Sequence, residues 1–251
     1  MVPAAIWATF VTLTASISVR SPTRLVFARA WAPPGPGLPW GATEGGIDLL
    51  AAVCHATMRG LVLALAVTGS GFVFGTLAGT VAGLRGGWIA RGLSRACDLV
   101  QAFPTFLIAL AVLAAVPSPS RGHLGAVFAL TAWAPFARMA LGQARILARA
   151  PYVEAARALG ASRARLLVPH VVPNLLGPVL VQAGSSAAAV VVAETALGFV
   201  GLGPRDGVSL GVLLEQGTLA MLRAPHVLLI SAAAVAMTSG TLQAASEAWR
   251  R

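Results

Sequence analysis

The stretch Gly60–Leu84 reads GLVLALAVTGSGFVFGTLAGTVAGL and contains no Asp, Glu, Arg or Lys. About 20 such residues in a helix cross the hydrocarbon core of a bilayer, so this stretch predicts a membrane span. The composition points the same way, because 57% of the 251 residues are hydrophobic and only 10% are charged. One soluble core cannot bury that much apolar surface, and a disordered chain would be far more polar.

Other stretches meet the same criterion, and Val2–Val19 lies at its lower length limit. They are Leu99–Ser120, Leu166–Ala193, Ala224–Ser246 and the shorter Gly122–Ala137, for which an extension past Arg138 is the alternative. The sequence therefore predicts an all-α, polytopic membrane helix bundle with five to six transmembrane helices. Because Pro33–Asp48 is rich in Pro and Gly, we expect a loop there. We divide the chain into 1–48, a short N-terminal membrane segment with an outer loop, and 49–251, the main transmembrane domain.

Four glycines recur at every fourth position of the first stretch, namely Gly71, Gly75, Gly79 and Gly83. In a membrane helix this spacing puts bare backbone along one face, which lets a neighbouring helix approach closely. We expect a packing face inside the bundle. A face that lines a transport pathway is the alternative.

All 18 basic residues are arginine, and they outnumber the 8 acidic residues to give a net charge of +10. The arginines stand singly at the ends of apolar runs, which is typical of charges that orient a membrane protein. Nucleic-acid binding would require a clustered basic face, so we do not expect it. The segment Arg138–Arg165 is the most polar long helical stretch, and we predict that it faces the cytoplasm. Alternation then places Arg85, Arg91, Arg95, Arg250 and Arg251 on the same side, whereas Arg20, Arg24 and Arg29 conflict with this rule.

The absence of lysine excludes the phosphate-binding loop GxxxxGK[ST], so the chain has no Walker-type ATP site of its own. Gly207-Val-Ser209-Leu-Gly211 matches the nucleophile elbow GxSxG, but it lies between apolar helices without the strand that this motif needs. The four histidines are scattered, and Cys54, His55 and Met58 are more simply explained by packing than by metal binding. We therefore predict no catalytic residue, no metal site and no bound cofactor.

Two acidic residues interrupt apolar segments, Asp98 and Glu194. Ionisable groups at membrane depth mark functional positions, so both are candidates for a gate or pathway. Glu194 could equally lie at the outer interface and have a structural role.

The run Tyr152-Val-Glu154-Ala-Ala156-Arg-Ala-Leu-Gly160-Ala-Ser162 predicts a helix, a sharp turn and a second helix. Gly160 can adopt the left-handed conformation that stops a helix, and Ser162 can cap the next one. Glu154-Ala155-Ala156 with Gly160 and Pro173 resembles the EAA signature of permease subunits in binding-protein-dependent ABC importers, the MetI-like transmembrane family.

Further motifs, in the same order, are similar to the dipeptide, oligopeptide and nickel branch of that family. They are Gly86-Gly87-Trp88, Asp98, Phe103-Pro104, His170–Asn174 and Glu194–Gly203. Trp40–Asp48 resembles the GTDELGRD stretch of the family only loosely, because Ile47 stands where arginine is common.

The resemblance implies that the EAA loop, near 138–173, forms a cytoplasmic coupling helix. Glu154, Ala155, Ala156, Arg157 and Gly160 would contact an ATP-binding subunit. The implied partners are a second permease subunit, two ATP-binding subunits that hold ATP and Mg, and an extracytoplasmic solute-binding protein. The implied location is the bacterial inner membrane, and the substrate would be a peptide, or nickel or a nickel chelate. A secondary transporter or a channel-like protein is the alternative.

Overall fold

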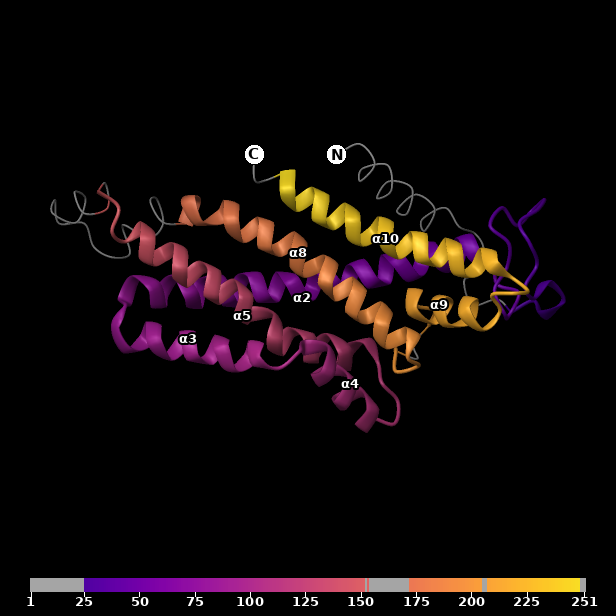
Figure 1. Cartoon of the computed structure of the whole chain (residues 1–251), viewed down its shortest axis with the longest axis horizontal. Coiled ribbons are helices and arrows are strands. Elements are labelled where there is room, and N and C mark those ends of the chain that lie inside the picture. Colours follow the sequence, from indigo (N-terminus) through magenta and orange to yellow (C-terminus); the bar gives the residue numbers. More distant parts are fainter. Residues whose placement is uncertain (1–24, 152, 154–171, 205–206, 249–251) are drawn as a thin grey trace.

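A computed structural model describes residues 25–151, 153, 172–204 and 207–248 of the chain. In this part, the regular structure consists of helices, drawn in Figure 1. They are the 3-10 turn η1 (Phe27–Arg29), α2 (Leu49–Arg85), α3 (Gly87–Ala102), α4 (Thr105–Ala115), α5 (Arg121–Leu147), α8 (Val172–Phe199), α9 (Leu210–Leu219) and α10 (Pro225–Ala248). The all-helical prediction is confirmed.

Helix α2 is longer than the span predicted from its apolar stretch. Asp48 caps it, since the carboxylate accepts a 3.0 Å hydrogen bond from the backbone N–H of Leu50. The helix ends at Gly86, whose φ of 68° suits a residue without a side chain. Its 37 residues extend over about 55 Å. That exceeds the hydrocarbon core, about 30 Å thick, so α2 projects well beyond it.

The predicted span Leu99–Ser120 is not one continuous helix. Helices α3 and α4 meet at an angle of 64° around Phe103 and Pro104. A residue that precedes proline is driven out of the helical conformation, and Phe103 has the extended φ and ψ of −101° and 127°. Within the described residues, four helices are long and apolar enough to cross a membrane, or five if the bent pair counts as one. Val2–Val19 lies outside the described residues.

Helix α5 takes the longer of the two predicted forms, because it continues past Ala137 and Arg138 to Leu147. The first turns of the predicted polar segment Arg138–Arg165 therefore belong to a long membrane helix. At the other end of α5, a capping box stabilises the first turn. The Ser120 hydroxyl accepts a hydrogen bond from the backbone N–H of His123, and Nδ1 of the His123 ring accepts one from the backbone N–H of Ser120.

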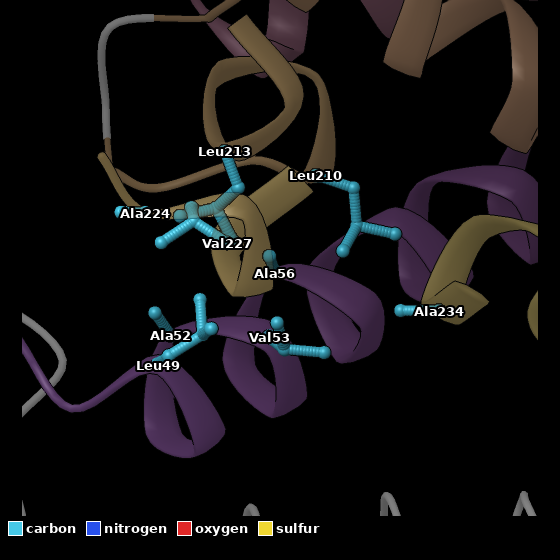
Figure 2. Close-up of a cluster of buried hydrophobic side chains, with 9 residues drawn as sticks. All are labelled: Leu49, Ala52, Val53, Ala56, Leu210, Leu213, Ala224, Val227 and Ala234. Carbon is cyan, nitrogen blue, oxygen red and sulfur yellow. The ribbon is translucent and has the colours of Figure 1, made fainter. Parts of the chain in front are cut away.

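The helices run lengthwise beside one another (Figure 1), and α2 and α5, which run parallel, form the most extensive contact of the bundle. Helices α8 and α10 pack side by side, and α9 lies near their junction. At that end a buried apolar cluster joins the start of α2 to α9 and the start of α10 (Figure 2). Its members are Leu49, Ala52, Val53, Ala56, Leu210, Leu213, Ala224, Val227 and Ala234. We call this the α9 end; the ends of α2 and α5 and the start of α8 form the opposite, α5 end.

Candidate functional sites along the bundle

The four glycines of α2 lie directly against the backbone of α5. A Cβ atom built on Gly71 would be 2.7 Å from the carbonyl oxygen of Ala132, and one on Gly83 would be 2.7 Å from Cβ of Ala144. Gly75 and Gly79 meet the intervening turns in the same way. Because α5 covers this face, the glycines are placed to pack two helices together and not to line an open channel.

Glu194 lies on α8 near the α9 end, and its side chain is buried. Its Oε1 atom is 3.8 Å from Nε of Arg121, the first residue of α5. Arg121 also donates a 3.4 Å hydrogen bond to the carbonyl of Val208, in the loop before α9. Gly60 of α2 provides room for the carboxylate, since a Cβ built there would be 2.9 Å from Oε2. Glu194 thus connects α2, α5, α8 and the loop before α9.

Asp98 lies elsewhere, on the exposed side of α3. Its carboxylate forms an ion pair with Arg138 of α5, and the side chains remain 58% and 45% exposed, respectively. Arg91 and Arg95 are exposed on the same helix. The structure therefore does not bring the two candidate acidic residues together.

The two ion pairs define two levels of the bundle. Glu194 is level with Gly60, whereas Arg138 lies between Ala137 and Ala140, which face Gly79. By the helical rise, the levels are about 25 Å apart along α2. Between them α2, α5 and α8 carry no charged residue. A slab of this thickness fits the hydrocarbon core of a bilayer, about 30 Å thick.

The predicted coupling residues Glu154, Ala155, Ala156, Arg157 and Gly160 lie outside the described residues. The described residues on either side of them are at the α5 end: α5 ends at Leu147, Val153 is buried, and α8 begins at Val172. The chain therefore enters and leaves this segment beside the last turns of α2.

The GxSxG match is explained by local structure. Ser209 is buried and caps α9, because its hydroxyl accepts a 3.3 Å hydrogen bond from the backbone N–H of Val212. Gly211 packs against α8, where a Cβ would be 2.7 Å from Cα of Gly198. The motif thus forms a close helix junction. Among the described residues, no group of three or more His, Cys, Asp or Glu side chains is arranged to hold a metal.

Comparison with known proteins gives matches over most of the chain. Residues 54–245 match the family model described as "Binding-protein-dependent transport system inner membrane component". The oligopeptide transport system permease protein OppC of Mycobacterium tuberculosis H37Rv is 33% identical over 203 residues, which cover 80% of this chain and 69% of that protein.

Other relatives and one solved structure agree. The glutathione transport system permease protein GsiD of Pectobacterium atrosepticum is 29% identical, over 79% of this chain and 66% of its own length. The dipeptide permease DppC of Alkalihalophilus pseudofirmus is 32% identical, over 65% and 54%. An inward-facing structure of the MetNI methionine ABC transporter superposes with a TM-score of 0.57 at 20% identity, over 80% of this chain and 97% of that one, and supports the fold alone.

Proposed function

Because the chain belongs to the family of binding-protein-dependent transport system inner membrane components, we propose that it forms part of a membrane pathway for small peptides. The chain is a multi-pass membrane transport subunit of an ABC importer. Relatives are named as oligopeptide, dipeptide and glutathione permeases, and these substrates share a peptide backbone and a terminal carboxylate. That shared chemistry favours a peptide over nickel or a nickel chelate.

The energy for transport would come from other subunits. The chain has no lysine with which to build a Walker phosphate loop. We therefore assign ATP and Mg to two partner ATP-binding subunits. A second permease subunit would complete the pathway, and an extracytoplasmic solute-binding protein would deliver the peptide at the α9 end.

The coupling residues have a mechanical route through the bundle. Helix α5 leads to the segment that contains Glu154 and Gly160, and α8 leads away from it. The close backbone contact between α5 and α2 would make these two helices move as one unit. A displacement of the coupling segment would then reach Arg121 and Glu194 at the opposite end.

Uptake into proteoliposomes tests this proposal. The permease pair is reconstituted with its ATP-binding subunits and binding protein, and labelled dipeptide, tripeptide and Ni²⁺ are offered in parallel. We expect ATP-dependent uptake of peptide and none of Ni²⁺. Uptake of Ni²⁺ alone, or uptake driven by an ion gradient without ATP, would contradict the proposal.

A variant of the coupling segment links uptake to this chain. Gly160→Trp places bulk in the segment that would contact the ATPase, so we expect peptide uptake to fall at least tenfold. Gly142→Trp is the matched control, because nothing lies within 4 Å of a Cβ built on Gly142 of α5. Equal uptake by the two variants would show that Gly160 does not take part in the contact with the ATP-binding subunit.

A further inference from the structure

A small pocket lies within the uncharged slab, where α2, α4, α5 and α8 converge. Most of its lining is apolar, and a few hydroxyl groups stand among the apolar side chains. Its volume is about 220 Å³, and its lining includes Val67 and Thr68 of α2, Thr105 of α4, Thr131 and Pro135 of α5, and Ser186 of α8. Thr68 is eight residues beyond Gly60, so the pocket is about 12 Å below the level of Glu194. It therefore lies near the middle of the slab.

The hydroxyl of Thr68 has no hydrogen-bond partner among the described residues, although the side chain is only 5% exposed. A threonine in a helix can donate to the carbonyl four residues earlier, as Thr80 and Thr195 do at 2.7 and 2.8 Å. Thr57 and Thr76 of α2 also lack a partner, but of these three only Thr68 lines the pocket. Leaving a hydroxyl unpaired at membrane depth costs about 1–3 kcal/mol. A ligand in the pocket would supply the missing partner.

The break between α3 and α4 adds backbone donors to the same pocket. Thr105 is the first residue of α4, and its cap, Pro104, provides no side-chain hydrogen bond. The first N–H groups of a helix have no partner within the helix, and the helix dipole makes that end positive. Thr105 lines the pocket, so the positive end of this eleven-residue helix lies at its wall.

Pro135 and Ser186 complete the polar lining. Pro135 has no N–H, so the carbonyl of Thr131 lacks its usual donor four residues later and is left as an acceptor, which suits a peptide N–H and not the carboxylate. Ser186 accepts a 3.0 Å hydrogen bond from the side-chain amide of Gln182 on the same helix. None of the described residues that line the pocket is acidic or basic. Hydroxyls and a positive helix end favour a carboxylate and disfavour an ammonium group.

We propose that this pocket binds the terminal carboxylate of the peptide during its passage through the membrane, with the Thr68 hydroxyl and the N-terminus of α4 as donors. This rests on the proposed peptide transport. The volume is below that of ordinary ligand pockets, about 300–1,000 Å³. It therefore suits the carboxyl-terminal end of a peptide and not a whole oligopeptide.

The test compares a dipeptide with its C-terminal amide in the reconstituted importer. Thr68→Val keeps the shape of the side chain and removes the hydroxyl. We expect uptake of alanyl-alanine to fall about tenfold while uptake of alanyl-alanine amide changes less than twofold. The binding protein is the same in both experiments, so its own preference between the two probes cancels.

Matched variants separate a binding role from a folding defect. Thr80→Val is the control, since Thr80 is buried on the same helix but its hydroxyl is already paired. Thr68→Ser should restore the preference for the free carboxylate. ATP hydrolysis stimulated by the loaded binding protein should remain within twofold of the wild type in all three variants.

The outcomes for this pocket and for the proposed function are distinct. If wild-type importer takes up neither probe, the proposed function fails. If wild type takes up alanyl-alanine but Thr68→Val reduces both probes equally, or behaves like Thr80→Val, the pocket does not bind the carboxylate.

Discussion

Gly75 has no room for even one additional carbon. A Cβ at this position would be 2.8 Å from Cβ of Phe136 and closer still to the carbonyl of Trp133. Gly75→Leu should therefore separate α2 from α5 and destabilise the protein by about 1–3 kcal/mol or more. Gly69→Leu is the control, because a Cβ at Gly69 has nothing within 4 Å. Thermal unfolding in detergent measures both variants, and equal midpoints would show that the two helices are not held in backbone contact.

Glu194 is expected to be a strong determinant of stability, since removing one member of a buried ion pair leaves the other charge uncompensated. Glu194→Gln leaves Arg121, which starts α5, facing a neutral amide. We expect a loss of about 3 kcal/mol in the free energy of unfolding.

A double-mutant cycle with Arg121→Gln isolates the pair. The double variant should be more stable than the sum of the two single losses predicts. Strict additivity would mean that Arg121 and Glu194 do not interact, and that the carboxylate has another role in transport.

At the scale of single elements, the sequence predicted the kind of structure better than its limits. The lack of charge in Gly60–Leu84 was sufficient to identify a membrane helix. The eleven residues that α2 adds before Gly60 include Arg59, which ends a run without Asp, Glu, Arg or Lys, although the Asp48 cap favours helix from Leu49. The same criterion could not decide whether α5 ends at Ala137 or extends past Arg138. The helix continues to Leu147, and Arg138 pairs with Asp98 of α3.

The partners of Asp98 and Glu194 could not be predicted from the sequence. Arg138 is 40 residues from Asp98, and only the packing of α3 on α5 brings them together. The sequence contains only a weak indication of these partners. Arg138, the partner of Asp98, and Arg121, the partner of Glu194, each stand at an end of an apolar run, as most arginines in this chain do. The glycine spacing was far more informative, because it specifies a face of a single helix.

The bend between α3 and α4 depends on Pro104, which removes a backbone donor and restricts Phe103. Pro104→Ala should let the helix continue through the break, with a smaller angle than 64°. Spin labels at the exposed positions Gly92 and Ala114 would report a longer distance by double electron–electron resonance. Pro117→Ala, in the loop after α4, is the control, and an unchanged distance in Pro104→Ala would assign the bend to tertiary packing.

At the scale of the whole molecule, the two charged levels predict where the bilayer lies. Leu130, 72% exposed, is on α5 between the levels, and Ile146, 66% exposed, is beyond the level of Arg138. After replacement of Cys54 and Cys97 by alanine, a cysteine at Ile146 should react rapidly with a membrane-impermeant thiol reagent in inside-out vesicles. A cysteine at Leu130 should be protected.

The same experiment in right-side-out vesicles tests the orientation that the arginine distribution predicts. Ile146→Cys should then be unreactive unless the membrane is permeabilised. Rapid labelling of Ile146→Cys from outside would show that the bundle has the opposite orientation. Rapid labelling of Leu130→Cys from either side would show that the bilayer does not surround the uncharged slab.

The contact between α2 and α5 also constrains how this protein can change over evolutionary time. Gly79 faces Ala140 and Gly83 faces Ala144, so each added methyl group on one helix needs a methyl group removed from the other. In sequences that diverge from this one, a larger residue on α2 should therefore be accompanied by a smaller residue at the facing position of α5, and the reverse. A descendant with alanine at residue 83 is expected to have glycine at residue 144, and mutational paths that pass through alanine at both positions should be rare.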